Sequence, residues 1–297
     1  MNKLVRIGTR GSALALWQAR QVQNMLGTIG LKSELVPISS GGDKELQKPL
    51  YEMGVQGIFT KELDAALLSG QIDIAVHSMK DVPTQLPKGI KIAFIPKRGP
   101  TADVFISTDN TWQDDKSTVA TSSLRRAAQW LHKYPHHNII DIRGNVPTRL
   151  KKLETLGCQG SIMAIAGLLR LEILPKQHTI LDWMVPAPAQ GALLVTTLES
   201  NKELTNKLLP LNHNETAICV TQERIFLREL EGGCTAPIGA VAKIEGDQIH
   251  FVGNITQSNG KQQLSFNQCV PTAKANDIGS KAAKDLLSRG AKTLLNG

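Results

Sequence analysis

The chain has 297 residues, 41% of them hydrophobic and 20% charged, which is the composition of an ordinary folded protein with room for two or three domains. Its 34 Lys and Arg residues outnumber its 26 Asp and Glu residues, and the formal net charge of +8 indicates an acidic partner. Aromatic residues make up only 4% and do not interleave with a basic run, which argues against a nucleic-acid partner. No apolar run is long enough for a membrane helix and no signal-peptide core is present, so we expect a cytoplasmic protein with no membrane partner.

The four cysteines stand singly, which is unlike a metal site or a disulfide framework. They are Cys158, Cys219, Cys234 and Cys269. None forms a CxxC pair, and none has a histidine nearby at metal-ligand spacing. We therefore expect no metal and treat each cysteine as a thiol.

A strand followed by a helix or loop recurs along the first 180 residues. Residues 3–10 are predicted to form a strand, and Ser12 opens a helix whose apolar side chains share one face. Four further segments show the same order: residues 71–83, 117–135, 138–157 and 160–173. This alternation predicts parallel sheets covered on both faces by helices.

At two short segments the chain is predicted to pass from one lobe to the other. They are "KRGPT" at 97–101 and "VPAPAQG" at 185–191. A chain that crosses twice forms a two-lobed clamp with a hinged cleft. The expected domains are residues 1–96 together with 192–212, residues 101–186, and residues 215–297.

The pattern changes after about residue 214. A helix ends in "LREL" and is followed by a glycine-cysteine loop. Residues 238–266 then predict an antiparallel meander with turns at "EGDQ" and "SNGK", and residues 278–295 predict a final helix. This part is expected to be a smaller α/β domain.

Arginines gather where the predicted strands end. They are Arg10, Arg125, Arg126, Arg143 and Arg149, with Arg170 one helical segment further on. Small hydrogen-bonding residues accompany them: Thr9, Ser12, Ser78, Thr121, Ser122, Ser123 and Asn145. Ligands of open α/β sheets bind at such strand ends, and guanidinium groups bind carboxylates bidentately, so the pattern indicates a ligand with several carboxylates. Any one of these arginines could instead lie on a solvated helix face.

Two further residues are candidates for chemistry. Asp81, next to Lys80, follows the apolar strand "IDIAV" and could stabilise a developing cation or transfer a proton, although it could also be a turn residue before Val82 and Pro83. Cys234 follows two glycines, which let the backbone turn sharply and present the thiol; an inert buried thiol is the alternative.

Many motifs of the chain resemble those of the hydroxymethylbilane synthase family, also called porphobilinogen deaminase. They include "GTRGSALALWQA", "IFTKELD", "DIAVHSMKDVPT", "TSSLRRAAQ", "RGNVPTRL", "NHNETA" and "ERIFLRELEGGCTAPIGA", in the same order over essentially the whole chain. The resemblance implies an α/β fold: two lobes related to periplasmic binding proteins with a hinged cleft, and a smaller C-terminal α/β domain with a three-stranded antiparallel sheet. It also implies a dipyrromethane cofactor, attached by motif position to Cys234.

The activity implied by the resemblance is the synthesis of a linear tetrapyrrole for haem biosynthesis. Four porphobilinogen molecules are deaminated, added head to tail to the cofactor, and released as hydroxymethylbilane by hydrolysis. Asp81 and Lys80 match the catalytic positions. The implied cofactor-binding residues are Cys234, Arg10, Ser12, Ser78, Lys80, Asp81, Thr121, Ser122, Ser123, Arg125, Arg126, Gly144 and Asn145. The implied substrate-binding residues are Arg10, Arg143, Arg149, Arg170 and Gln190. A monomer is expected, with no metal.

Three departures from the family pattern stand out. Gln56 replaces an expected lysine, Glu52 lies where some members are basic, and Pro188-Ala189 replaces Val-Gly before Gln190. The last change is expected to stiffen the second crossing. A non-catalytic two-lobed protein that binds polycarboxylates is the alternative function, and it would need no group on Cys234.

Overall fold

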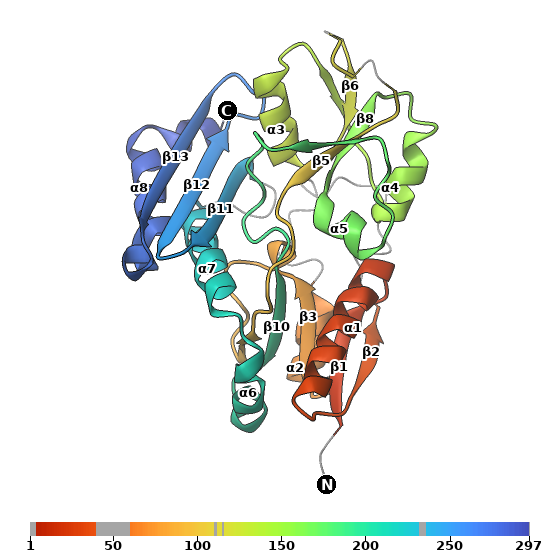
Figure 1. Ribbon diagram of the computed structural model, residues 1–297, viewed down its shortest axis with the longest axis vertical. Helices are drawn as coiled ribbons and strands as arrows, with labels where there is room; N and C mark the ends of the chain where they lie inside the picture. Colours follow the sequence, from red (N-terminus) through yellow and green to blue (C-terminus); the bar gives the residue numbers. More distant parts are fainter. Residues whose placement is uncertain (1–3, 40–59, 110–111, 115, 232–235, 297) are drawn as a thin grey trace. The chain divides into compact units, whose positions relative to one another are not determined.

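The computed structural model describes residues 4–39, 60–109, 112–114, 116–231 and 236–296. Within these ranges the chain forms three sheets, two with five strands and one with three (Figure 1). The fold separates into two compact units. Of the described residues, unit 1 holds 4–39, 60–99 and 191–217, and unit 2 holds 100–109, 112–114, 116–190, 218–231 and 236–296.

Unit 1 is built on a mixed sheet with strand order β2-β1-β3-β10-β4. The strands are β1 (Val5–Arg10), β2 (Ser33–Ile38), β3 (Ile74–Ser78), β4 (Ile90–Phe94) and β10 (Leu193–Leu198). The helical elements are α1 (Ala13–Thr28), α2 (Lys61–Leu68), α6 (Lys202–Leu208), η2 (Met79–Asp81) and η3 (Leu209–Leu211). β1 runs parallel to both β2 and β3, so the carboxyl ends of these strands lie at one edge of the sheet.

Helix α1 begins where the sequence predicts. The Ser12 side chain accepts a hydrogen bond from the Ala15 backbone N–H at 3.3 Å and so caps the helix. Val22 and Leu26 on this helix are fully buried in one cluster with Ile7 and Ile74 of the sheet. The apolar face therefore fixes α1 against β1 and β3, and its N-terminus lies beside the ends of these strands.

Unit 2 contains a second mixed sheet with strand order β7-β6-β8-β5-β9. Its strands are β5 (Asp103–Ser107), β6 (Thr118–Ala120), β7 (Asn138–Ile140), β8 (Gly160–Ala164) and β9 (His178–Leu181). Helices α3 (Leu124–Lys133), α4 (Val146–Leu153) and α5 (Ile165–Arg170) follow β6, β7 and β8. These three strands are parallel neighbours, so all three helices start at the same edge of the sheet.

The predicted parallel pairing holds for only part of each five-stranded sheet. β10 runs antiparallel to β3 and β4, and β5 runs antiparallel to β8 and β9. A parallel return needs a long crossover, usually a helix. β5 and β10 instead follow the predicted crossing segments directly, with no helix between β4 and β5 or between β9 and β10 in the described chain.

The C-terminal part of unit 2 confirms the predicted meander. β11 (Ile238–Glu245), β12 (Gln248–Thr256) and β13 (Gln263–Pro271) pair antiparallel in sequence order. The helical elements here are α7 (Asn214–Glu229), η4 (Thr272–Asp277), α8 (Ile278–Ser288) and α9 (Ala291–Asn296). Phe226, Phe251 and Leu286 are fully buried in the core.

The single final helix predicted from the sequence is in fact two. The chain leaves α8 at Ser288, and α9 begins at Ala291. Gly290 between them has a φ of 93°, a left-handed backbone conformation that ends an α-helix and that glycine adopts without a steric penalty.

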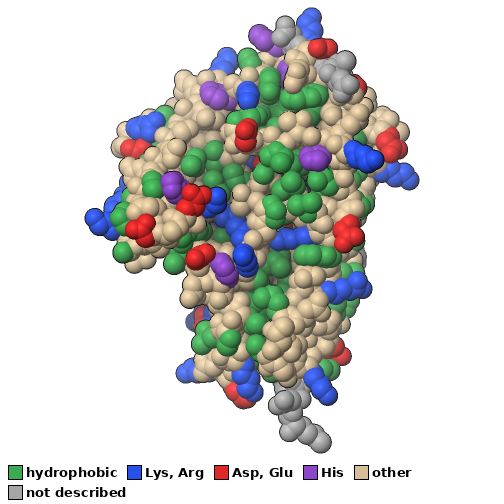
Figure 2. All heavy atoms as spheres, viewed as in Figure 1, with side chains coloured by type: hydrophobic (Ala, Val, Ile, Leu, Met, Phe, Trp, Pro, Cys, Tyr) green, Lys and Arg blue, Asp and Glu red, His purple; other side chains and the backbone are tan. Residues whose placement is uncertain are grey.

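Basic and acidic side chains are mixed on the face shown in Figure 2. Among the side chains coloured there, Lys and Arg do not form one continuous stripe.

Candidate active site

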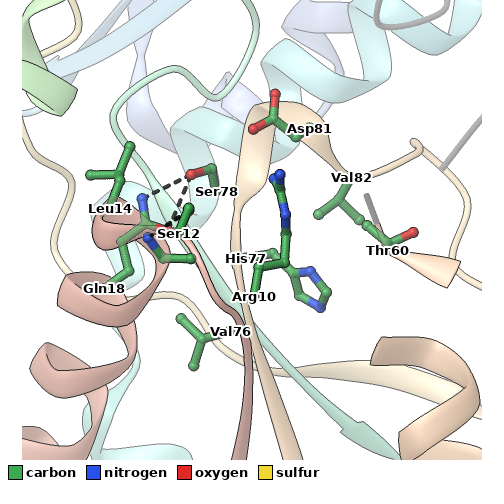
Figure 3. A pocket seen from close by; sticks show the side chains of 11 residues that line it. Arg10, Ser12, Leu14, Gln18, Thr60, Val76, His77, Ser78, Asp81 and Val82 are labelled. Atoms are coloured by element: carbon green, nitrogen blue, oxygen red, sulfur yellow. Dashed lines mark hydrogen bonds between the residues drawn. The ribbon is translucent and has the colours of Figure 1, made fainter. Parts of the chain in front are cut away.

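A pocket in unit 1 forms where β1 and β3 end beside the start of α1 (Figure 3). Its lining residues are Arg10, Ser12, Leu14, Ala15, Gln18, Thr60, Val76, His77, Ser78, Asp81 and Val82. Because β1 and β3 are parallel neighbours, their last residues, Arg10 and Ser78, reach the same edge. The structure thus brings together Arg10, Ser12, Ser78 and Asp81, as the sequence predicts for this unit.

Asp81 ends the short 3-10 turn that follows β3. Figure 3 shows the Arg10 side chain extending from β1 toward the side of the pocket where the Asp81 carboxylate lies. Both residues are half-buried, so they are partly shielded from water yet open to a ligand. Lys80 belongs to the same turn and is not among the residues that line the pocket.

Ser78 contacts a residue that the sequence analysis does not single out. Nε2 of Gln18 donates to Oγ of Ser78 at 2.8 Å, and the same Oγ is within donating distance of Oε1 of Gln18 at 3.2 Å. Gln18 is only 3% exposed and lies on α1, with the pair drawn in Figure 3. The bond donated by Gln18 is the shorter of the two, and with it in place the hydroxyl proton of Ser78 can turn from Oε1 of Gln18 to a carboxylate in the pocket.

His77 also lines the pocket, although the sequence shows no partner for it. Its ring is buried, with Nε2 3.4 Å from Oγ1 of Thr196. Burial, and then the positive charge of Arg10, lower the pKa of His77 from 6.5 to about 4. His77 is therefore neutral near pH 7 and does not add to the positive charge of Arg10.

In unit 2 the loop between β6 and α3 carries three of the predicted residues. Ser123 caps α3 by accepting from the Arg126 N–H. Oγ of Ser122 donates to the Ile142 carbonyl at 2.9 Å and accepts the Ile142 N–H at 3.0 Å. Thr121 is buried and accepts the Ser123 N–H. These contacts fix the loop to the segment that leads into α4.

Arg125 and Arg126 form a buried ionic cluster with Asp103, a residue that the sequence analysis missed. Nη1 of Arg125 lies 2.8 Å from Oδ2 of Asp103, and Nη2 of Arg126 lies 2.8 Å from Oδ1. The exposed fractions are 4% for Arg125, 6% for Arg126 and 0% for Asp103. Burial alone would raise the pKa of Asp103, but the charges of Arg125 and then Arg126 hold it well below its usual value.

The start of α4 carries the predicted Arg-Gly-Asn group. Asn145 caps the helix by accepting the Thr148 N–H at 2.9 Å. Gly144 has a φ of 122°, and a Cβ there would lie 2.7 Å from Cγ2 of Thr148, so this position requires glycine. Nε of Arg149 donates to the Gly144 carbonyl at 2.7 Å, which orients the guanidinium beside the helix N-terminus.

The other predicted residues of unit 2, Arg143, Arg170 and Gln190, do not contact one another through the hydrogen bonds described below. The Arg143 carbonyl accepts from Nζ of Lys152 at 3.1 Å. Arg170 ends α5, and burial lowers its pKa. Nε2 of Gln190 donates to the Thr101 carbonyl at 2.7 Å and to Oδ1 of Asp103 at 3.0 Å. Gln190 therefore joins the buried ionic cluster.

Several sequence predictions lie outside the described residues. They concern the cofactor attachment at Cys234 and the departures at Gln56 and Glu52. The departure at Pro188-Ala189 is described: Ala189 has a φ of 60°, the left-handed region that a glycine adopts more easily. Its N–H donates to Oε2 of Glu223 at 2.6 Å, and Oε1 of Glu223 accepts the Ala242 N–H at 2.7 Å.

The described ranges contain neither a cluster of metal ligands nor a membrane-spanning helix. No group of three or more His, Cys, Asp and Glu side chains there could hold a metal ion. Among the helices of the same ranges, none combines the length and the apolar character needed to cross a membrane.

Two solved structures of other proteins resemble the chain at low identity. The second substrate-binding domain of a protein assigned as an amino acid ABC transporter, from Streptococcus pneumoniae, is 12% identical, with a TM-score of 0.44 and coverage of 76% of this chain and 94% of that one. The BvgS VFT2 domain of Bordetella pertussis is 13% identical, with a TM-score of 0.41 and coverage of 72% and 90%. These scores are too low to support an inference about this chain.

Sequence comparison gives a much stronger match. The profile of the dipyrromethane cofactor-binding domain of porphobilinogen deaminase matches residues 5–206, and the profile of the C-terminal domain of porphobilinogen deaminase matches residues 217–288. A protein of Syntrophotalea carbinolica named porphobilinogen deaminase is 41% identical over 298 aligned residues, which cover 98% of this chain and 95% of that protein. Together with the strand-end arginines and Asp81 described above, these matches show that the chain belongs to the porphobilinogen deaminase family.

Proposed function

We propose that the chain is a hydroxymethylbilane synthase. It removes ammonia from four porphobilinogen molecules, joins them head to tail on a dipyrromethane primer, and releases the product with water. The reaction balances as four porphobilinogen plus one water giving one hydroxymethylbilane and four ammonia. Each pyrrole carries an acetate and a propionate, so the growing chain accumulates negative charge and requires many cationic groups.

The observation that carries the proposal is the buried ionic cluster of Arg125, Arg126 and Asp103. Two positive charges and one negative charge leave a net charge of +1, and all three side chains are almost fully buried. Nε of Arg125 is buried and makes no hydrogen bond to any described residue. An uncompensated buried charge with an unused donor is costly unless an anion completes it. A carboxylate of the primer supplies that anion, so the residues fit the cofactor.

When bound, the dipyrromethane would supply the free pyrrole α-carbon to which the first porphobilinogen is joined, and each later porphobilinogen would join the pyrrole added before it. Arg10 binds substrate and primer carboxylates at the end of β1. Ser12, at the positive end of α1, and Ser78, held by Gln18, add hydrogen bonds to the same groups.

Asp81 is the proposed residue for proton transfer. Its carboxylate lies in the pocket, accepts pyrrole N–H groups, stabilises the positive charge that develops as ammonia leaves, and accepts the proton lost from the joining carbon. Lys80, in the same turn, balances the charge of the incoming carboxylates. His77 is neutral near pH 7, so the charged side chains that line the pocket are Arg10 and Asp81.

Cys234 is the proposed attachment point, through a thioether. A covalent attachment needs an accessible thiol with thiolate character. Cys158 and Cys219 are each only 5% exposed, and burial raises the pKa of Cys158, so neither suits this role. Cys269 is exposed on β13 and provides a matched control.

Intact-mass measurement tests the proposal. The purified protein should be heavier than its 297 residues by two linked pyrroles, and porphobilinogen should add further pyrrole units in steps. Cys234→Ser should abolish both additions, whereas Cys269→Ser should retain them. A wild-type mass equal to that of the bare chain, with no porphobilinogen consumed, would favour the non-catalytic polycarboxylate-binding protein instead.

The family resemblance also supports two finer proposals. The enzyme works as a monomer, which light scattering after size-exclusion chromatography would test. It works in the cytosol, which fractionation of the source cells would test.

A further inference from the structure

Asp103 is the first residue of β5 and lies at the centre of the buried ionic cluster. Its Oδ1 accepts from Nε of Arg126 at 3.1 Å, from Nη2 of Arg126 at 2.8 Å and from Nε2 of Gln190 at 3.0 Å. Its Oδ2 faces Nη1 of Arg125 at 2.8 Å. Oδ1 of Asp103 thus binds Arg126 and Gln190, and Oδ2 binds Arg125.

The two arginines differ in how many of their N–H donors are already used in bonds to the protein. Arg126 uses Nε and Nη2 on Asp103 and donates from Nη1 to the Ile162 carbonyl at 3.0 Å. Arg125 uses a single nitrogen, Nη1, which also donates to the Val185 carbonyl at 2.8 Å. Nε of Arg125 has no hydrogen-bond partner among the described residues. Arg126 therefore anchors Asp103, and Arg125 keeps donor capacity for an anion.

We propose that Asp103 is a positioning residue that fixes the Arg125 guanidinium for one carboxylate of the dipyrromethane, with Arg126 as its anchor. The inference rests on the proposed function. No sequence motif points to Asp103, because an aspartate before a strand reads as an ordinary loop residue. Its importance comes from total burial and from contacts to two segments far away in the chain, at Arg125–Arg126 and at Gln190.

Two accounts of the cluster make opposite predictions for Asp103→Asn. If only positive charge mattered, removing the carboxylate would raise the net charge from +1 to +2 and keep or improve cofactor retention. If Asp103 positions Arg125, the loss of the anionic oxygen that faces Nη1 frees the guanidinium to turn, and retention falls. Asparagine has nearly the same shape as aspartate, so the space that Asp103 fills is preserved.

The experiment measures the fraction of protein that carries two pyrroles, by intact mass, for the wild type and for Asp103→Asn and Asp103→Glu. We expect at least a tenfold lower ratio of loaded to bare protein in Asp103→Asn and a partial recovery in Asp103→Glu, which restores the charge. Equal loading of Asp103→Asn and the wild type would overturn the proposal. Equal loss in both variants would also overturn it, because a carboxylate would then have no special role.

Asp73 provides the matched control. It is 9% exposed and accepts two side-chain hydrogen bonds from Arg6, both at 3.0 Å, in unit 1. Asp73→Asn weakens another Asp–Arg ion pair, in which the Arg6 side chain is 31% exposed, and should leave the loading unchanged. Loss of loading in Asp73→Asn as well would attribute the effect to general destabilisation and overturn the assignment to Asp103.

A double variant keeps the test valid if Asp103→Asn does not fold. Asp103→Leu with Arg126→Met removes one charge of each sign, so the cluster keeps its net charge of +1, and apolar replacement of a buried ion pair is often tolerated. We expect this variant to fold and to lose the cofactor, and full loading would overturn the proposal. A wild type without any bound pyrrole would instead refute the proposed function, so the two failures are distinguishable.

Discussion

Ala189 offers a direct measurement of strain in the second crossing. Its φ of 60° lies in the left-handed region, which costs a residue with a Cβ about 1–2 kcal/mol. Replacing Ala189 with glycine relieves this strain, removes one buried methyl group worth about 0.8 kcal/mol, and gives the unfolded chain roughly 0.5–1 kcal/mol of extra entropy. These contributions nearly cancel, so Ala189→Gly should change the free energy of unfolding by less than about 1 kcal/mol.

Ala187, two residues earlier, is the matched control, because its φ is not positive. Ala187→Gly has the entropy cost and loses part of a buried methyl group, but it relieves no strain. The free energy of unfolding should therefore fall by about 1–2 kcal/mol more in Ala187→Gly than in Ala189→Gly.

Urea unfolding followed by tryptophan fluorescence is a suitable assay. Three of the four tryptophans, Trp112, Trp130 and Trp183, lie in one aromatic cluster of unit 2, the unit that also holds both alanines, so most of the signal reports on this unit. Equal losses in the two glycine variants would refute the reasoning, because they would show that the left-handed backbone at Ala189 carries no strain. The bond from the Ala189 N–H to buried Glu223 explains how the strained conformation is maintained.

Three further predictions concern the pocket of unit 1. Asp81→Asn should retain the bound dipyrromethane by intact mass but lower turnover by about 10²–10⁴-fold, and wild-type turnover would remove Asp81 from the proton transfers. Gln18→Leu should raise the KM for porphobilinogen about fivefold with a smaller change in kcat, because Ser78 loses the bond that orients it. The control is Gln23→Leu, which loses a bond from the same helix to the Ser33 carbonyl and should leave the KM unchanged. Equal KM values in both variants would contradict the role of Gln18 in orienting Ser78. His77 has a pKa of about 4 in the folded chain and about 6.5 in the unfolded chain, so a proton binds the unfolded chain first as the pH falls. The free energy of unfolding therefore decreases as the pH drops from 6.5 to 4, by roughly 3 kcal/mol in total. Urea unfolding at pH 7 and pH 5 should show about 2 kcal/mol of this loss in the wild type and a smaller loss in His77→Gln. Equal losses would show that His77 is not the group responsible.

The sequence predicted the parts of the fold that local patterns determine. Ser12 caps α1 as expected, because a serine before an apolar helical stretch supplies the missing hydrogen-bond acceptor. The meander from β11 to β13 also follows from its alternating residues and its turns. The antiparallel directions of β5 and β10 could not be predicted, because the direction of a strand that enters a sheet without a crossover helix depends on the tertiary structure.

The candidate site shows the same division between local and long-range information. The arginines could be predicted as candidates because the ends of parallel strands meet at one edge, a rule that needs only the order of strands and helices. Gln18 and Asp103 were missed because their roles arise from contacts 60 and 23 residues away along the chain. Sequence position alone treats Arg125 and Arg126 as equivalent cationic groups, whereas burial with Asp103 makes one an anchor and leaves the other with a free donor. Charge counted from the sequence therefore overstates the charge available to the ligand: in this cluster two arginines present one net positive charge, and it is this remainder that a carboxylate of the primer can neutralise.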